Sequence, residues 1–174
     1  MDAEKAEELE DESRYRFVSR EEILEHVSED DVVIDIGSGT GFFTDDIADV
    51  VEKVYAVDFQ EQMHRHYRDK GVPENVELLQ GKASEIEIQA DIIVSIFSFH
   101  EIEQEKALET FSRVLEDGGK LLMFDWSSRG SAECGPPPEK RLNAESAAKK
   151  IGGFFEVEEA VERRDTFKVV ASVK

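Results

Sequence analysis

Hydrophobic residues follow two alternating patterns along the chain. Short apolar runs, with the composition of strands buried on both faces, are separated by stretches in which apolar residues recur every three or four positions. Phe43, Ile47 and Val51 form one such helical stripe. Expected strands span residues 32–36, 53–58, 75–80, 91–99, 120–126, 154–161 and 166–173, and expected helices span residues 20–28, 43–51, 60–70, 104–115 and 143–151.

Short polar and glycine-containing segments mark the ends of these elements. Ser19 and Glu22 have the spacing of a helix capping box, and residues 117–119 (Asp-Gly-Gly) predict a turn between a helix and a strand. Residues 162–165 form the short connection that is typical of an antiparallel hairpin. Residues 127–142 contain glycines and three consecutive prolines and predict a long loop, which either roofs a pocket or serves as a surface connection.

The length of the chain favours one folded domain. A chain of 174 residues buries roughly 70% of its unfolded surface, enough for one substantial core. We assign residues 19–174 to this domain and expect residues 1–18, whose first twelve include seven acidic side chains, to form a partly disordered tail. Arg14, Arg16 and Arg20 interrupt that acidic segment; they either balance its charge or belong to a flap over a ligand site.

The charge of the chain is strongly negative. With 41 acidic against 21 basic residues, the formal net charge is -20. The sequence shows no basic stripe of the kind that contacts phosphates, so we expect no nucleic-acid partner. Acidic residues are spread through the whole chain, which favours a protein of a high-salt cytoplasm, where salt screens the self-repulsion; an ordinary acidic protein is the alternative.

Cysteine content and hydropathy point to a cytoplasmic, soluble protein. Cys134 is the single cysteine, so an intrachain disulfide is impossible and a reducing compartment is consistent. No apolar run approaches the ~18 residues of a membrane span, and no leader signal is expected. His64 and His66 are two residues apart, a spacing that points them to different sides of a helix, so we expect surface histidines and no metal site.

The segment that begins with the first strand carries the strongest functional signal. Residues 32–36 lead directly into Gly37, Gly39 and Gly41, and a glycine turn before a helix lets backbone N–H groups approach a small ligand. A dinucleotide fingerprint requires a glycine where Phe42 stands, and no lysine followed by Ser or Thr completes a phosphate-binding loop. The turn therefore predicts a small ligand and disfavours a dinucleotide.

Besides the glycine turn, two further features of the sequence resemble those of a known family. Asp58 ends the second strand, 23 positions beyond Asp35, where this kind of fold hydrogen-bonds a ribose diol. The Asp-x-Gly-x-Gly-x-Gly pattern of residues 35–41, together with residues 113–121, which resemble a stretch leading through Gly-Gly into strand five, is similar to class I S-adenosylmethionine (SAM) methyltransferases. Within that family the chain most resembles the small-molecule branch that includes ubiquinone and menaquinone biosynthesis methyltransferases.

The resemblance implies a fold and a cofactor site. The implied fold is an α/β, Rossmann-like sandwich with a seven-stranded, mostly parallel sheet in the order 3-2-1-4-5-7-6, an antiparallel seventh strand and helices on both faces. SAM is the implied cofactor. Lys82 stands where the family usually has an acid. The implied cofactor-binding residues are Asp35, Gly37, Ser38, Gly39, Asp58, Phe59, Lys82, Ala83 and Ile96.

The implied reaction is direct displacement at the sulfonium methyl by a small-molecule acceptor. His100, with Asp125 as the second candidate, is expected to orient or deprotonate the acceptor. The chain lacks the Asn-Pro-Pro-Tyr type of motif found in amino-group nucleic-acid methyltransferases. Two alternatives stay open at this stage: a SAM-binding regulatory or scaffold protein without turnover, and a dinucleotide-dependent oxidoreductase, which Phe42 disfavours. Oligomeric state and the identity of the acceptor cannot be inferred from the sequence.

Overall fold

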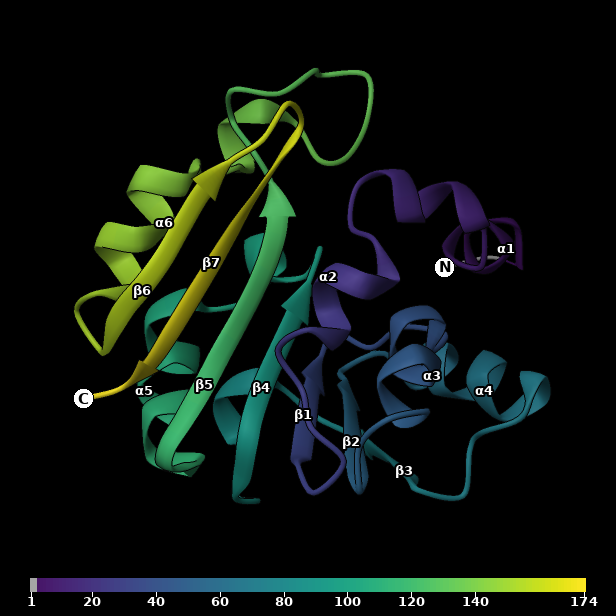
Figure 1. The fold of residues 1–174 in the computed structure, drawn as a ribbon. Coiled ribbons are helices and arrows are strands. Elements are labelled where there is room, and N and C mark those ends of the chain that lie inside the picture. The colour runs from purple at the N-terminus through teal and green to yellow at the C-terminus, as the bar shows by residue number, and fades with distance from the viewer. Residues whose placement is uncertain (1–2) are drawn as a thin grey trace.

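The structure, a computed structural model, describes residues 3–174, and within them a seven-stranded sheet has the order β3-β2-β1-β4-β5-β7-β6 (Figure 1). Strands β1 to β5 pair in parallel, whereas β7 is antiparallel to both β5 and β6. The expected sheet order and the C-terminal hairpin are confirmed. The strands are β1 (Val32–Ile36), β2 (Lys53–Asp58), β3 (Val76–Gln80), β4 (Ala90–Ile96), β5 (Leu115–Trp126), β6 (Phe155–Glu162) and β7 (Thr166–Val173).

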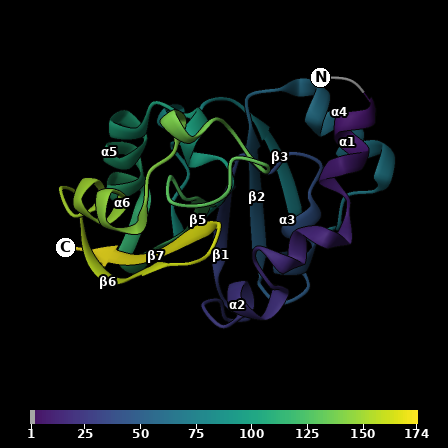
Figure 2. The same ribbon diagram turned by 90° about the horizontal axis from the view of Figure 1, so that it is seen from above.

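Helices cover both faces of this sheet (Figure 2). One face packs against α5 and α6, with Leu108, Phe111 and Ile151 buried, and the other packs against α2, α3 and α4, with Ile23, Ile47 and other apolar residues buried. The described helices are α1 (Ala3–Leu9), α2 (Arg20–Leu24), α3 (Phe42–Ala48), α4 (Glu61–Lys70), α5 (Gln104–Val114) and α6 (Ala144–Ile151), with short 3-10 helices η1 (Glu12–Arg16), η2 (Ala83–Glu85), η3 (Phe99–Glu101) and η4 (Pro138–Lys140).

Strand β1 lies at the centre of the molecule because its residues are buried on both faces. Ile34 and Ile36 belong to the core under α5 and α6, whereas Val33 belongs to the core under α2 and α3. Strand β2 pairs with one side of β1 and β4 with the other, so the chain order reverses direction at β1. Ligands of open α/β sheets bind beyond the carboxyl ends of the strands at such a point.

The glycine turn after β1 is shaped by close packing. Gly37, Gly39 and Gly41 all have positive φ, of 68°, 58° and 87°. A Cβ on Gly37 would lie 2.3 Å from the Cβ of Ser98, and one on Gly41 would lie 2.2 Å from the ring of Tyr67. Glycine is therefore needed at positions 37 and 41 for two reasons: a side chain would clash with its neighbours, and the backbone has the left-handed conformation that glycine adopts readily.

The N-terminal segment, which we expected to be a partly disordered tail over residues 1–18, contains helical structure. Met1 and Asp2 lie outside the described residues, but the residues that follow form α1 and η1. The Thr40 hydroxyl donates a hydrogen bond to Glu10, and the Tyr15 hydroxyl donates to Asp46 Oδ2 at 2.7 Å. Val18 is fully buried. These anchors at Glu10, Tyr15 and Val18 hold the segment over the carboxyl ends of the strands, despite its acidity.

Three local expectations need correction. Residues 117–119 do not separate a helix from a strand: β5 begins at Leu115, and Gly118, with φ 78°, lies at an irregularity in its pairing with β4. Helix α2 is shorter than expected, although the Ser19 and Glu22 capping box is present. His64 is buried rather than at the surface, and its Nε2 has no hydrogen-bond partner within the described part of the chain.

Candidate active site

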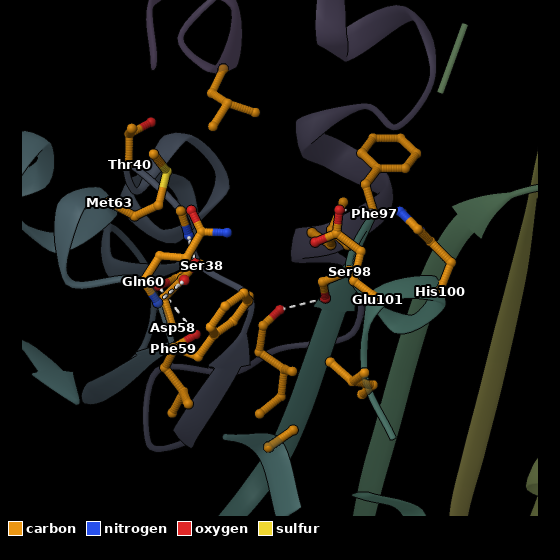
Figure 3. A pocket seen from close by; sticks show the side chains of 18 of the residues that line it. Ser38, Thr40, Asp58, Phe59, Gln60, Met63, Phe97, Ser98, His100 and Glu101 are labelled. Atoms are coloured by element: carbon orange, nitrogen blue, oxygen red, sulfur yellow. Dashed lines mark hydrogen bonds and ion pairs between the residues drawn. The ribbon is translucent and has the colours of Figure 1, made fainter. Parts of the chain in front are cut away.

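A cavity of about 770 Å³ opens at the carboxyl ends of the central strands, within the range of small-ligand sites. Six segments of the described chain line it: the N-terminal segment, the glycine turn after β1, the segments at the ends of β2, β3 and β4, and the loop after β5. Asp58 and Phe59 lie on one side of the cavity, and His100 and Glu101 lie on the other (Figure 3). We call these two sides the Asp58 end and the His100 end.

Asp58 joins the glycine turn to the start of α4. Its Oδ2 accepts a hydrogen bond from the backbone N–H of Gly39 at 2.9 Å, and its Oδ1 accepts one from the N–H of Gln60 at 2.9 Å. Burial raises the pKa of the Asp58 carboxyl, although both backbone hydrogen bonds oppose that shift. Each carboxylate oxygen keeps a lone pair for a further donor from the cavity, such as a hydroxyl group.

Apolar and backbone surfaces surround Asp58 in the cavity. Phe59 directly follows it and has 57% of its surface exposed, so one aromatic face is free to cover a ligand. Lys82, Ala83 and Ile96 also line the cavity, as do Gly37, Ser38 and Gly39. The cavity therefore brings together eight of the nine cofactor-binding residues that the sequence analysis named.

Asp35 is the predicted cofactor residue that does not line the cavity. It lies on β1 beneath the turn with 3% of its surface exposed, and its Oδ2 accepts a hydrogen bond from the Thr44 hydroxyl at 2.6 Å. Burial raises the pKa of Asp35 to about 7, and the nearby charge of Asp58 contributes to the shift. Its geometry fits a brace that links β1 to α3.

His100 is held by two carboxylates at the other end of the cavity. Its Nδ1 lies 2.8 Å from Asp125 Oδ1, and its backbone N–H donates to Asp125 Oδ2 at 2.9 Å. Its Nε2 lies 3.7 Å from Glu101 Oε1, an ion-pair distance that exceeds a hydrogen bond. Burial opposes protonation, but the interactions with Asp125 and Glu101 outweigh it and raise the pKa of His100 to about 9. The ring is therefore an imidazolium at neutral pH.

Asp125 acts behind His100 rather than in the cavity. It has 2% of its surface exposed and is not among the residues that line the cavity. Besides the two contacts to His100, it accepts the backbone N–H of Trp126 at 2.8 Å. This set of hydrogen bonds fixes the ring plane of His100, so the carboxylate positions the histidine and does not itself face a ligand.

Three aromatic side chains beside His100 form what we call the aromatic corner: Phe17, Phe97 and Trp126, all of which line the cavity. Phe97 stacks on Trp126 with ring centroids 4.8 Å apart, and Phe17 meets Trp126 edge-on at 4.7 Å. Phe97 has a φ of 57°, a strained conformation for a residue other than glycine. The sequence analysis missed this corner, since nothing local to residue 97 signals its backbone conformation.

The loop over residues 127–142 is organised from inside by Arg141. The guanidinium donates hydrogen bonds to the carbonyl oxygens of Pro136 at 2.7 Å and Ser131 at 2.9 Å. Gly135 packs so closely on Trp126 that a Cβ there would lie 2.6 Å from the indole ring. Gly135 and Pro136 line the cavity, as expected for a loop that roofs a pocket.

Comparison with known proteins identifies the family. Residues 34–123, more than half of the chain, match the model of a family described as a methyltransferase domain. The chain belongs to this methyltransferase family. The matched residues contain the glycine turn, Asp58 and His100. Its solved and curated relatives place it among the SAM-dependent methyltransferases, with SAM as the cofactor.

Two curated relatives cover part of the chain. A ubiquinone/menaquinone biosynthesis C-methyltransferase of Ectopseudomonas mendocina is 32% identical over 110 residues, which are 57% of this chain and 43% of the relative. An uncharacterized methyltransferase of a Geobacillus strain is 28% identical over 127 residues, which are 68% of this chain and 59% of the relative. The chain thus spans about half the length of the curated relatives it matches.

Solved structures extend the similarity to the whole chain. A SAM-dependent methyltransferase of Aquifex aeolicus is 29% identical, covers 100% of both chains and has a TM-score of 0.89. A methyltransferase of Haloferax volcanii, solved in complex with the Trm112 activator, is 14% identical with a TM-score of 0.81 over 98% of this chain and 94% of its own, and shows the fold alone. Among residues 3–174, no helix is long and apolar enough to cross a membrane, and no cluster of potential metal ligands occurs.

Proposed function

We propose that this protein transfers the methyl group of SAM to a small-molecule acceptor by direct displacement. When bound, SAM supplies an activated methyl group on a sulfonium, so the protein has to position the acceptor in line behind that group. Positioning alone contributes on the order of 7–11 kcal/mol in favourable intramolecular reactions. The curated relatives named for ubiquinone and menaquinone biosynthesis support a small molecule as the acceptor.

The Asp58 end has the groups that an adenosine requires. The free lone pairs of Asp58 accept the ribose hydroxyls, and Phe59, Ala83 and Ile96 enclose the adenine together with the backbone at Lys82. Gly39 is the glycine of the turn at which a Cβ would meet no close neighbour, since its nearest contact would be Leu9 at 3.7 Å. The N–H groups of Gly37 and Ser38 donate to the Val57 carbonyl oxygen and that of Gly39 donates to Asp58, so the open position at Gly39 gives the methionine part of SAM space beside the turn.

The His100 end provides the acceptor site. As an imidazolium, His100 donates a hydrogen bond through Nε2 and orients the acceptor, while Asp125 holds the ring through Nδ1. Of the two roles predicted for His100, the raised pKa favours orientation, because a residue with a pKa of about 9 is a poor proton acceptor at neutral pH. The aromatic corner and Pro136 of the roofing loop exclude water from the same space.

The observation that carries the proposal is one cavity with a ribose-type carboxylate at one end and a clamped histidine at the other. Calorimetric titration with SAM and with NAD tests the cofactor, and we expect binding of SAM only. Incubation with SAM and a cell extract, followed by measurement of S-adenosylhomocysteine, tests turnover. SAM binding without product in any extract would favour the regulatory or scaffold alternative. Binding of NAD in place of SAM would favour the oxidoreductase.

A further inference from the structure

Arg14, on the N-terminal segment, is a charged group that the assigned site leaves unexplained. Its guanidinium carbon lies 4.7 Å from the ring centre of Phe43 and 5.2 Å from that of Phe42, and it lines the cavity. Its Nη1 donates to the Leu9 carbonyl at 2.6 Å. Burial lowers the pKa of Arg14 to about 10, so the guanidinium remains charged at neutral pH.

Arg14 has no carboxylate partner among residues 3–174. Arg20, by contrast, pairs with Asp46 at 3.0 Å. The acidic groups whose charges act on Arg14 bond elsewhere, since Glu10 accepts from Thr40 and Lys70, and Asp35 accepts from Thr44. A guanidinium carries five N–H donors, and one serves Leu9 here. A partly buried cation with free donors at a cavity calls for an anionic ligand.

The position of Arg14 indicates which part of the ligand it meets. Phe42 and Phe43 begin α3 directly after the glycine turn, and Phe97, 5.9 Å from the guanidinium carbon, follows β4. Asp58 is the last residue of β2, the neighbour of β1 on the side away from β4. Arg14 therefore lies across the glycine turn from the ribose-binding carboxylate, where the amino-acid part of a bound SAM would extend.

We infer that Arg14 binds the carboxylate of the cofactor's methionine part, an inference that rests on the proposed function. The planar guanidinium matches a carboxylate with two parallel hydrogen bonds. The N-terminal segment, which also contributes Leu9 and Phe17 to the cavity, is then part of the cofactor site.

The test compares two adenosine thioethers that differ in the amino-acid part. S-Adenosylhomocysteine carries the carboxylate, and 5′-methylthioadenosine lacks it while keeping the adenosine that Asp58 recognises. Calorimetry on the full chain should show that Arg14→Met weakens the binding of S-adenosylhomocysteine by about 10- to 100-fold and leaves the affinity for 5′-methylthioadenosine unchanged. Arg16→Met, at an exposed neighbour on η1, is the matched control and should change neither affinity.

Each other outcome has a distinct meaning. An equal loss for both ligands in Arg14→Met would mean that the residue only supports the fold, and an unchanged affinity for S-adenosylhomocysteine would also overturn the inference. If circular dichroism shows that Arg14→Met does not fold, Arg14→Lys serves as the second variant, because lysine keeps the charge but loses the planar fork of donors. Arg14→Lys should lower the ratio of S-adenosylhomocysteine affinity to 5′-methylthioadenosine affinity by about 3- to 10-fold. An unchanged ratio would overturn the inference. Failure of the wild type to bind either ligand would instead refute the proposed function.

Discussion

The two ends of the cavity are built from different kinds of structure. At the Asp58 end, the ligand-facing groups lie on the glycine turn or at, or directly after, the last residues of strands β2 to β4. At the His100 end, they come from segments that are distant in sequence: η1, the loop after β4, the end of β5 and the loop over residues 127–142. The first end is determined by local backbone geometry, and the second depends on how remote segments pack together.

Under the proposed function, this difference separates cofactor binding from acceptor recognition. Asp58 is fixed by two backbone N–H groups, that of Gly39 in the turn and that of Gln60 two residues along the chain. His100, in contrast, is fixed by the side chain of Asp125 from another strand, and Phe97 by stacking on Trp126. Substitutions at the His100 end should therefore change turnover without changing SAM affinity. Substitutions at the Asp58 end should weaken SAM binding and leave turnover at saturating SAM largely unchanged.

The largest expected effect is at His100. His100→Gln removes the oriented donor and should lower S-adenosylhomocysteine formation on the order of 100-fold, while SAM affinity measured by calorimetry stays unchanged. His66→Gln, on α4 and outside the cavity, is the matched control and should leave turnover intact. If His100→Gln weakened SAM binding as much as turnover, the division between the two ends would be wrong.

Asp58→Ala should have the complementary effect. We expect SAM binding to weaken by about 10- to 100-fold, from the loss of a charged hydrogen bond worth roughly 1.5–3 kcal/mol. Saturating SAM should restore turnover in large part, because the His100 end is untouched. Asp69→Ala, an exposed acid on α4, controls for the loss of one negative charge. An unchanged affinity in a folded Asp58→Ala variant would refute the ribose assignment.

The sequence was most informative about the fold where hydrophobic runs and turns are local. The buried composition of residues 32–36 and the short connection at 162–165 were enough to place a central strand and an antiparallel hairpin. The acidic composition of the N-terminal segment indicates disorder, whereas the contacts of Tyr15 with α3 and of Val18 with the core are a tertiary effect that composition does not report. His64 was misjudged for the same reason, since burial depends on what packs against α4.

The candidate site, like the fold, was predictable where local sequence patterns determine it. Asp58 could be named from its spacing to the glycine turn, and His100 from its place after a strand at the carboxyl edge of the sheet. Asp125 was named as a second candidate for contact with the acceptor, but only the folded chain places it behind His100. Arg14 and Phe97 acquire their positions from contacts with residues far along the chain, and no local pattern reports such contacts.

The pH dependence of stability tests whether His100 is clamped as the structure indicates. Its pKa is raised from 6.5 to about 9 on folding, so protonation stabilises the folded state fully below pH 6.5, and this contribution is lost as the pH rises through 9. Urea unfolding should show wild-type stability falling by about 2 kcal/mol between pH 7 and 9, and His100→Gln should show a flatter profile. Identical slopes in the two proteins would mean that Asp125 and Glu101 do not hold an imidazolium.

The smallest expected effect is that of salt, which should act differently on the outer surface and on the cavity. The net charge of the chain is -20, but the acidic groups that line the cavity are accompanied there by Lys5, Arg14 and Lys82. Salt screens exposed charges more than partly buried ones, so KCl should reduce self-repulsion at the surface and leave cofactor contacts largely unaffected. Raising KCl from about 0.1 to about 1 M should stabilise the fold by about 1 kcal/mol, or roughly 2–4 °C in Tm, with little change in SAM affinity. Full stability in dilute buffer would count against adaptation to high salt, and a large loss of SAM affinity in KCl would show that exposed charges contribute to the site.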